Sequence, residues 1–196
     1  MIPVLLIRHG PTEWNVVGRI QGRTDVSLSA DGRREVSRWC VPEEFRSYDW
    51  MASPLARALE TATLLGAVPA QPDRRLAEKN WGEWEGLTWE ELRDKYGDDA
   101  IGDATSGLDF RPPGGESSRS VQERFSQWLA EVARRGRPVA AVTHRGVIRA
   151  ALAIATGWDM KGKPPYRLDW ASAHLFKINR DQTLAVDRLN IGLASS

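Results

Sequence analysis

Two short apolar runs in the chain are each followed at once by a polar segment containing histidine and glycine. Residues 3–7 (PVLLI) precede Arg8, His9 and Gly10, and residues 138–143 (PVAAVT) precede His144. Short continuous apolar runs are typical of strands buried on both faces, as in parallel sheets. Because ligands of open α/β sheets bind beyond the carboxyl ends of such strands, both histidines are predicted to lie at one binding edge.

Amphipathic helices are predicted between these two strands. Residues 55–65 carry an apolar stripe at helical spacing, with Ser53 as the N-cap and Pro54 at the first helical position. A capping box that begins at Thr88 opens a short helix, which extends to about Tyr96.

The second half of the chain continues the alternation. A capping box at Ser120 opens a predicted helix that continues to 136, and residues 147–156 form another that stops at a glycine. Residues 173–178 and 184–189 are predicted to be strands of a terminal hairpin. The alternation predicts an α/β fold, a three-layer α/β/α sandwich with a mostly parallel central sheet.

Two segments fit neither helix nor strand. Residues 102–117 are rich in glycine and proline, and residues 157–166 are rich in lysine, glycine and proline. The first is long enough to serve as a lid over a site. The length of 196 residues suits a single domain that spans residues 1–196.

Composition excludes several classes of partner. The 27 basic and 26 acidic side chains give a net charge of +1, so we expect neither a nucleic acid nor a membrane surface as partner. The single Cys40 excludes an intrachain disulfide and fits a reducing compartment. No apolar stretch approaches the length of a membrane span, so we expect a cytoplasmic protein. Nothing in the sequence assigns an oligomeric state.

Arginine outnumbers lysine several-fold, which changes the picture because a guanidinium group suits the binding of a tetrahedral anion. A phosphomonoester dianion reacts through a loose transition state, in which positioning and charge balance supply most of the catalysis. Histidine can attack phosphorus through a neutral ring nitrogen and form a covalent intermediate. Arg8 and His9 after the first strand, with His144 after the second, are therefore candidates for this chemistry.

The segment from Arg8 to Thr12 (RHGPT) resembles the signature of the histidine phosphatase superfamily, which includes phosphoglycerate mutases and many phosphomonoesterases. The resemblance implies a phosphoglycerate-mutase-like fold. It spans residues 4–149, and the family's further elements follow in order at 21–25, 53–58, 78–86, 113–117 and 142–146.

The resemblance also implies roles for particular residues. His9 is the nucleophile, and Arg8 and Arg57 bind the phosphoryl oxygens together with His144. Glu78 protonates the leaving group and then accepts a proton from the attacking water. Glu83 lies in the same loop and is the alternative proton donor.

Further residues of the matched elements are expected to bind substrate: Asn15, Gln21, Gly22 and Arg145. The side chain of Arg145 replaces the family's commoner glycine, and it either adds a cation at the mouth of the site or points to solvent. The same two alternatives hold for Arg19 and Arg23. If these side chains face inward, the substrate carries more negative charge than one phosphate.

Other features are interpreted as structural. His174 lies inside a predicted strand without a motif around it. Trp81, Trp84 and Trp89 cluster around the acidic loop, where the favoured interpretation is that they are core residues or fasten the loop. The alternative, that one or two of them form a wall of the substrate pocket, stays open in the sequence.

Competing phosphatase chemistries fit the sequence poorly. Cys40 and Arg46 have the spacing of cysteine phosphatases, but the loop between them holds a proline and two glutamates, which neither donate to nor attract a phosphate. With only three histidines and no metalloprotease or P-loop motif, we expect no metal and no cofactor.

The expected function is metal-independent hydrolysis of a phosphomonoester, a small phosphorylated metabolite, through a phosphohistidine. The first alternative is a phosphoglycerate mutase primed by bisphosphoglycerate, although such mutases are typically longer. The second is a catalytically inactive, phosphate-binding regulatory domain.

Overall fold

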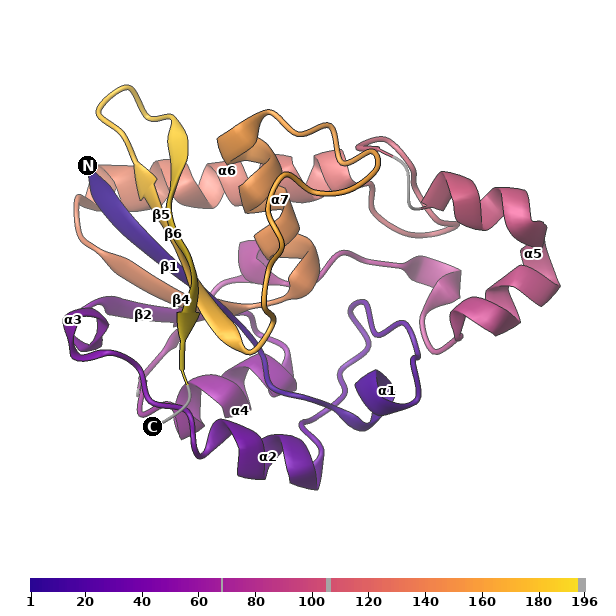
Figure 1. The fold of residues 1–196 in the computed structure, drawn as a ribbon, viewed down its shortest axis with the longest axis horizontal. Helices are drawn as coiled ribbons and strands as arrows, with labels where there is room; N and C mark the ends of the chain where they lie inside the picture. The colour runs from indigo at the N-terminus through magenta and orange to yellow at the C-terminus, as the bar shows by residue number, and fades with distance from the viewer. Residues whose placement is uncertain (68, 105–106, 194–196) are drawn as a thin grey trace.

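The computed structural model describes residues 1–67, 69–104 and 107–193, and a six-stranded sheet forms its centre (Figure 1). The order across the sheet is β3-β2-β4-β1-β5-β6. Strands β3, β2, β4 and β1 run parallel, whereas β5 and β6 add antiparallel pairings at one side. The strands are β1 (Ile2–Arg8), β2 (Asp49–Ala52), β3 (Gln71–Pro72), β4 (Val139–Thr143), β5 (Ser172–Ile178) and β6 (Leu184–Gly192).

Helices cover both faces of the sheet, as Figure 1 shows. Val4 and Leu6 of β1 pack into one cluster with α6 (Ser118–Arg135) and α7 (Arg145–Thr156). Leu5 and Ile7 point to the other face, against α2 (Ala30–Val36) and α3 (Glu43–Arg46). Helix α4 (Ala56–Leu64) packs beside them on β2 and β4. This is the three-layer α/β/α sandwich predicted from the alternation of elements.

A smaller aromatic cluster lies outside the sandwich. Trp84, Leu92 and Ile20 form its buried part, and α5 (Trp89–Ala104) supplies one side of it. Gly97 interrupts α5 with a φ of 83°, a conformation that favours glycine. Figure 1 shows α5 projecting from the sheet on the side where α1 (Glu13–Val16) lies, and the short helices η1 (Arg74–Leu76) and η2 (Gly82–Trp84) lead toward it.

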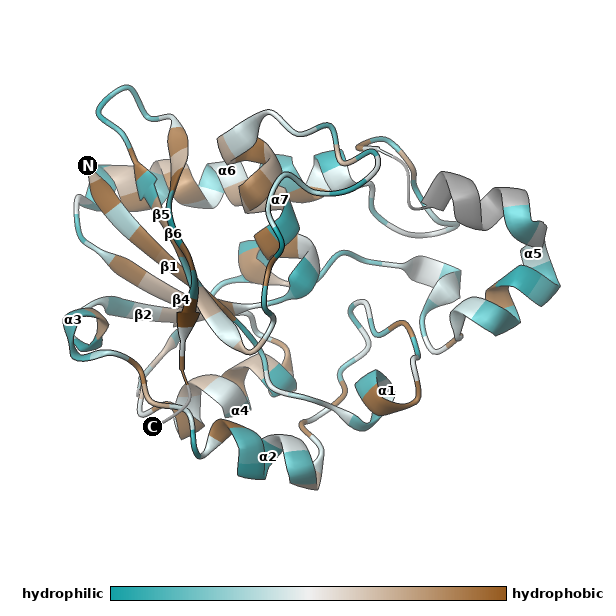
Figure 2. Cartoon of the chain, in the orientation of Figure 1, coloured by the Kyte–Doolittle hydropathy of each residue, from teal (hydrophilic) through white to brown (hydrophobic). Residues whose placement is uncertain are grey.

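Hydrophobic residues dominate the two central strands, β1 and β4, as the colouring by hydropathy in Figure 2 shows. Their burial explains why the sequence of each is a continuous apolar run. All five residues of β4 are buried, as are Val4 to Ile7 of β1. Strand β1 is paired on both edges and covered on both faces. Its side chains therefore face apolar surroundings on both sides of the sheet, and polar residues do not alternate with apolar ones.

Three expectations about local structure need correction. Ser53 does not cap α4: the cap position falls to Leu55, whose amide donates to the Ser53 hydroxyl at 3.3 Å, and the same hydroxyl lies 2.7 Å from His144 Nε2. Ser120 does not cap α6 either, because its own amide donates to the Ser117 hydroxyl at 3.1 Å and the helix begins at Ser118. The expected lid at 102–117 begins inside α5, and residues 105–106 of it lie outside the described residues.

Among the residues that the structure describes, no helix combines the length and the apolar character that a membrane crossing needs.

The core beneath α6 makes a stability prediction. Phe125 is fully buried, and its ring stacks on Trp128 at 5.3 Å between centroids. We expect Phe125→Ala to lower the free energy of unfolding by about 3–5 kcal/mol in urea denaturation, because a cavity remains. Ser126→Ala on the exposed side of the same helix should change it by less than about 0.5 kcal/mol. Equal losses in the two variants would contradict this packing.

Candidate active site

The two predicted histidines meet where β1 and β4 end. Arg8 pairs with Thr143 in the parallel ladder, and the His9 amide donates to the Thr143 carbonyl at 2.9 Å. His9 and His144 follow directly, with ring centroids 5.0 Å apart and ring planes inclined by 57°. Both side chains are almost entirely buried.

The tautomer of His9 follows from its hydrogen bond. Its Nδ1 lies 2.7 Å from the Gly10 carbonyl oxygen, which can only accept, so Nδ1 carries the hydrogen. Burial, with the nearby cations Arg8 and Arg57, lowers the pKa of His9 well below its usual value. A neutral ring protonated on Nδ1 leaves the lone pair on Nε2. His9 can therefore act as a nucleophile through Nε2.

His144 is held by Ser53, which the sequence had predicted to be a helix N-cap. Its Nε2 lies 2.7 Å from the Ser53 hydroxyl, while its buried Nδ1 has no hydrogen-bond partner among the described residues. Burial lowers the pKa of His144 well below the usual value, with His9 and nearby arginines adding to the effect. With Ser53 donating to Nε2, the ring would carry its hydrogen on Nδ1 and offer it to an anion.

Arg57 is fully buried and oriented by main-chain carbonyls. Its terminal nitrogens donate to Thr24 O at 2.9 Å and to Gly22 O at 2.7 Å. The Nε atoms of Arg8 and Arg57 are buried and have no hydrogen-bond partner within the described chain. Burial lowers the pKa of both guanidinium groups, and Glu78 opposes this. Arg57 is thus held in place, and two guanidinium groups with unused donors can bind a tetrahedral anion.

Glu78 lies against the first turn of α7. The Gly146 amide donates to both of its carboxylate oxygens, at 3.1 and 3.2 Å, and the Lys79 amide donates to Oε1 at 2.8 Å. A β-carbon on residue 146 would overlap Oε1, so this approach requires glycine. Glu78 influences the pKa of Arg8 and Arg57, whereas Glu83 is exposed on η2. Of the two loop glutamates, Glu78 is the one placed beside the arginines.

The expected substrate-binding residues of the first loop contribute in different ways. Gly22 has a φ of +53° and uses its carbonyl to orient Arg57. Asn15 Oδ1 accepts from the amide and hydroxyl of Thr12 at 3.0 and 3.1 Å, which directs its Nδ2 the other way. Gln21 is buried, and its Oε1 has no partner in the described part of the chain.

The three additional arginines separate in the structure. Arg19 bonds the Gly86 carbonyl and pairs with Glu91 at 3.2 Å, which directs it to α5. Arg23 pairs with Glu116 at 3.0 Å and donates to the Glu78 carbonyl at 3.4 Å, so it braces the acidic loop. Arg145 alone of the three lies close enough to Arg8 to influence its pKa.

Glu85 is a structural residue that sequence reasoning did not single out. Its carboxylate accepts from the amides of Arg23 and Thr24, both at 2.8 Å, and from the Trp81 amide at 3.0 Å. It thereby joins the loop that orients Arg57 to the loop that carries Glu78. No local spacing connects these segments, because they lie far apart along the chain.

The tryptophans near the acidic loop form a stack. Trp84 is buried and stacks on Trp81 at 6.1 Å, and Trp89 meets Trp81 edge-on at 5.8 Å. Lys79 lies with its Nζ 4.6 Å from the centre of the Trp81 ring, and burial lowers the pKa of this ammonium to about 8. Trp84 is thus a core residue of the outer cluster, and Trp81 and Trp89 are only partly covered.

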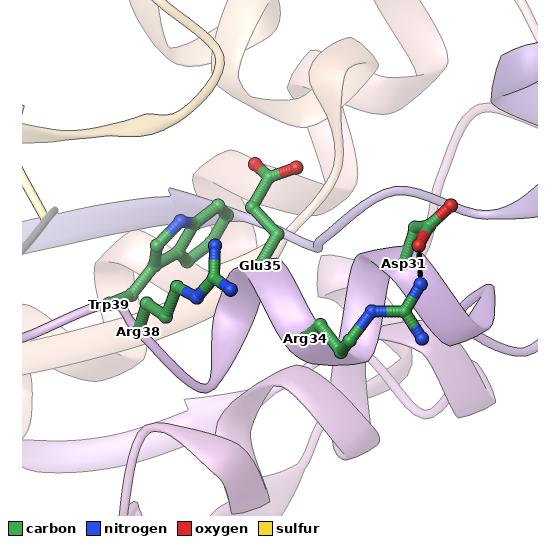
Figure 3. Close-up of a pocket in the computed structure, with 5 residues that line it drawn as sticks. All are labelled: Asp31, Arg34, Glu35, Arg38 and Trp39. Carbon is green, nitrogen blue, oxygen red and sulfur yellow. Dashed lines mark hydrogen bonds and ion pairs between the residues drawn. The ribbon is translucent and has the colours of Figure 1, made fainter.

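A surface hollow of about 330 Å³ lies elsewhere, on α2 (Figure 3). Charged side chains line it, and Arg34 is bonded to Asp31. It contains none of the residues that carry the chemistry above, so we assign it no role. Among the described residues, no group of three or more His, Cys, Asp or Glu side chains is placed to hold a metal ion.

Neutral histidines make stability depend on pH. In the unfolded chain all three bind protons as the pH falls through about 6.5, whereas burial keeps His9 and His144 from doing so and lowers the pKa of His174 to about 4. The free energy of unfolding should therefore fall as the pH is lowered from 6.5 to 5, by up to about 1.4 kcal/mol per pH unit for each ring.

Urea denaturation at a series of pH values measures this dependence. The Asn190 amide donates to His174 Nδ1 at 3.3 Å, and His174→Gln keeps an acceptor for it. This variant should remove about a third of the slope of unfolding free energy against pH. A free energy of unfolding that is constant between pH 6.5 and 5 would rule out the neutral rings.

Comparison with known proteins identifies the family. The family model described as "Histidine phosphatase superfamily (branch 1)" matches residues 4–191. A glucosyl-3-phosphoglycerate phosphatase of Mycolicibacterium vanbaalenii is 33% identical over 82% of this chain and 77% of its own. A 2,3-bisphosphoglycerate-dependent phosphoglycerate mutase of Gloeobacter violaceus is 32% identical over 78% and 74%.

Among solved structures, a mycobacterial glucosyl-3-phosphoglycerate phosphatase in complex with VO3 superposes with a TM-score of 0.83 at 27% identity. The match covers 98% of this chain and all of that one. Sequence, fold and the paired histidines agree, and the chain belongs to the histidine phosphatase superfamily.

Proposed function

We propose that the chain hydrolyses a phosphomonoester, a small phosphorylated metabolite, through a phosphohistidine on His9 and without a metal. One observation carries the proposal: the His9 ring is neutral, holds its hydrogen on Nδ1, and lies 5.0 Å from the His144 ring, near the guanidinium groups of Arg8 and Arg57. A nucleophile of this kind next to a dianion site is what transfer of a phosphoryl group requires.

In the first step, Arg8, Arg57 and the Nδ1 hydrogen of His144 balance the charge of the phosphoryl oxygens. The lone pair of His9 Nε2 forms a bond to phosphorus while the bond to the leaving oxygen breaks. Glu78 in its protonated form donates a proton to that oxygen. Gly22 holds Arg57 in place, and Asn15 Nδ2 and Gln21 complete the set of groups that bind the phosphoryl oxygens.

In the second step, water attacks phosphorus and gives a proton to the Glu78 carboxylate. The bond between phosphorus and nitrogen breaks, its electron pair returns to Nε2, and inorganic phosphate leaves. Glu78 thus serves first as acid and then as base, and the enzyme returns to its starting protonation state.

A phosphoglycerate mutase is the second candidate, because a relative with that name matches this chain over most of its length. The mutase would return the phosphoryl group to a phosphoglycerate instead of water. Adding 3-phosphoglycerate with a bisphosphoglycerate primer separates the two. Release of phosphate supports the hydrolase, whereas rapid formation of 2-phosphoglycerate supports the mutase.

The nucleophile can be tested directly. We expect the wild type to hydrolyse p-nitrophenyl phosphate in the presence of a chelator, and His9→Ala to lose at least 1,000-fold in kcat, on the order of what loss of a covalent nucleophile costs. An acid-labile, base-stable label should appear on the wild type alone. Ser126→Ala on the exposed side of α6 is the control, because it changes none of the groups that take part in this chemistry. No turnover by the wild type would leave an inactive phosphate-binding domain.

The position of Glu78 can be tested without altering Glu78. Gly146→Ala places a methyl group against Glu78 Oε1. Because this displaces the proton donor, we expect kcat to fall by about 100-fold. The loss should be large for an alkyl phosphate and small for p-nitrophenyl phosphate, whose leaving group is weakly basic. Gly192→Ala is the control, since a β-carbon there meets nothing within 4 Å. An equal loss with both substrates would argue against a proton donor at this place.

A further inference from the structure

Trp170 comes two residues before β5, and its indole faces two arginines. The guanidinium carbon of Arg8 lies 5.8 Å from the ring centre, and that of Arg145 lies 5.2 Å from it. The His174 ring meets the same indole edge-on at 6.4 Å. One aromatic ring thus contacts the guanidinium group of Arg8 and that of Arg145.

The backbone around Trp170 is fixed by a tight turn. Asp169 accepts from the Ala171 amide at 3.1 Å and from the Ser172 hydroxyl at 2.8 Å, and its own amide donates to Asn190 Oδ1 at 2.7 Å. These bonds attach the turn to β5 and β6. The backbone that carries the indole is therefore held in place beneath the two arginines.

Arg145 lies among like charges. Among the described side chains it forms no ion pair, and its charged neighbours include Arg8 and Arg149. Arg149, one turn further along α7, rests on a different indole, that of Trp158, at 4.9 Å. Burial and the charge of Arg145 lower the pKa of Arg149. An anion between Arg145 and the phosphoryl site would relieve this repulsion.

The charges of the site leave room for such an anion. A phosphomonoester carries up to two negative charges, which Arg8 and Arg57 match. The guanidinium group of Arg145 is additional, and its side chain is exposed at the N-terminus of α7. A stacked guanidinium has already lost part of its conformational freedom, so it binds an anion at a smaller entropic cost than a free one.

Building on the phosphatase proposed above, we propose that Arg145 binds a second anionic group of the substrate and that Trp170 is the positioning residue that holds Arg145 there. The substrate class is a phosphomonoester with a further carboxylate or phosphate within reach of the same site. Trp170 acts through the arginine and does not touch the reacting atoms.

Matched substrates test this on the full chain. Glycerol 3-phosphate, 3-phosphoglycerate and glycerol 1,3-bisphosphate share a leaving oxygen of similar basicity and differ in the second anion. The readout is the ratio of kcat/KM for each doubly anionic substrate to kcat/KM for glycerol 3-phosphate. Both values come from one preparation, so the ratio does not depend on the fraction of folded enzyme.

We expect the wild type to prefer one of the two doubly anionic substrates by at least tenfold, which also identifies the second anion. Arg145→Gln and Trp170→Leu should each reduce that ratio about tenfold, chiefly through KM. Trp170→Phe, which keeps an aromatic face, should retain most of it. Trp158→Leu, which removes the indole beneath Arg149, should retain it fully.

Three results would overturn the proposal: a wild type without preference for either doubly anionic substrate, a ratio unchanged in Trp170→Leu, or an equal reduction in Trp158→Leu. Failure of the phosphatase proposal itself looks different. In that case the wild type would not hydrolyse p-nitrophenyl phosphate, which carries no second anion.

Discussion

The parallel pairing of β1 with β4 in one register sets the geometry of everything at the site. Arg8 lies opposite Thr143, so His9 and His144 leave the sheet next to each other. A slip by one residue would reverse the faces of Val4 to Ile7, which pack into separate clusters on the two sides. The apolar packing that makes this slip costly therefore also fixes the distance between the two histidines.

Buried positive charge is the second determinant of the site. Arg57 is fully covered, and main-chain carbonyls of Gly22 and Thr24 compensate part of the lost hydration. Donors fixed in this way need little rearrangement when a charged group arrives. Burial, with the charges of Arg8 and Arg57 adding to it, keeps His9 neutral, so the burial of the site and its cations together set the state of this ring.

Features encoded in neighbouring residues were predictable from the sequence, and features that depend on distant contacts were not. The strands, the order of layers and the motif residues follow from local patterns, and His9 and His144 meet as expected. Ser53 was predicted as a cap because only its neighbours in the sequence could be considered. Its partner in the structure, His144, lies in a distant segment. Glu85 and Trp170 likewise gain their contacts only in the folded chain, since neither carries a motif that names its partners.

The central position of β1 also has a consequence for how the protein is made. Its partners, β4 and β5, come from the second half of the chain, so the strand that leads to His9 is synthesised long before either neighbour exists. Such non-local pairing is slow to form, and an unpaired apolar strand is prone to aggregation in the meantime. His9 is thus synthesised well before His144, and it reaches its position only once the later strands have paired with β1.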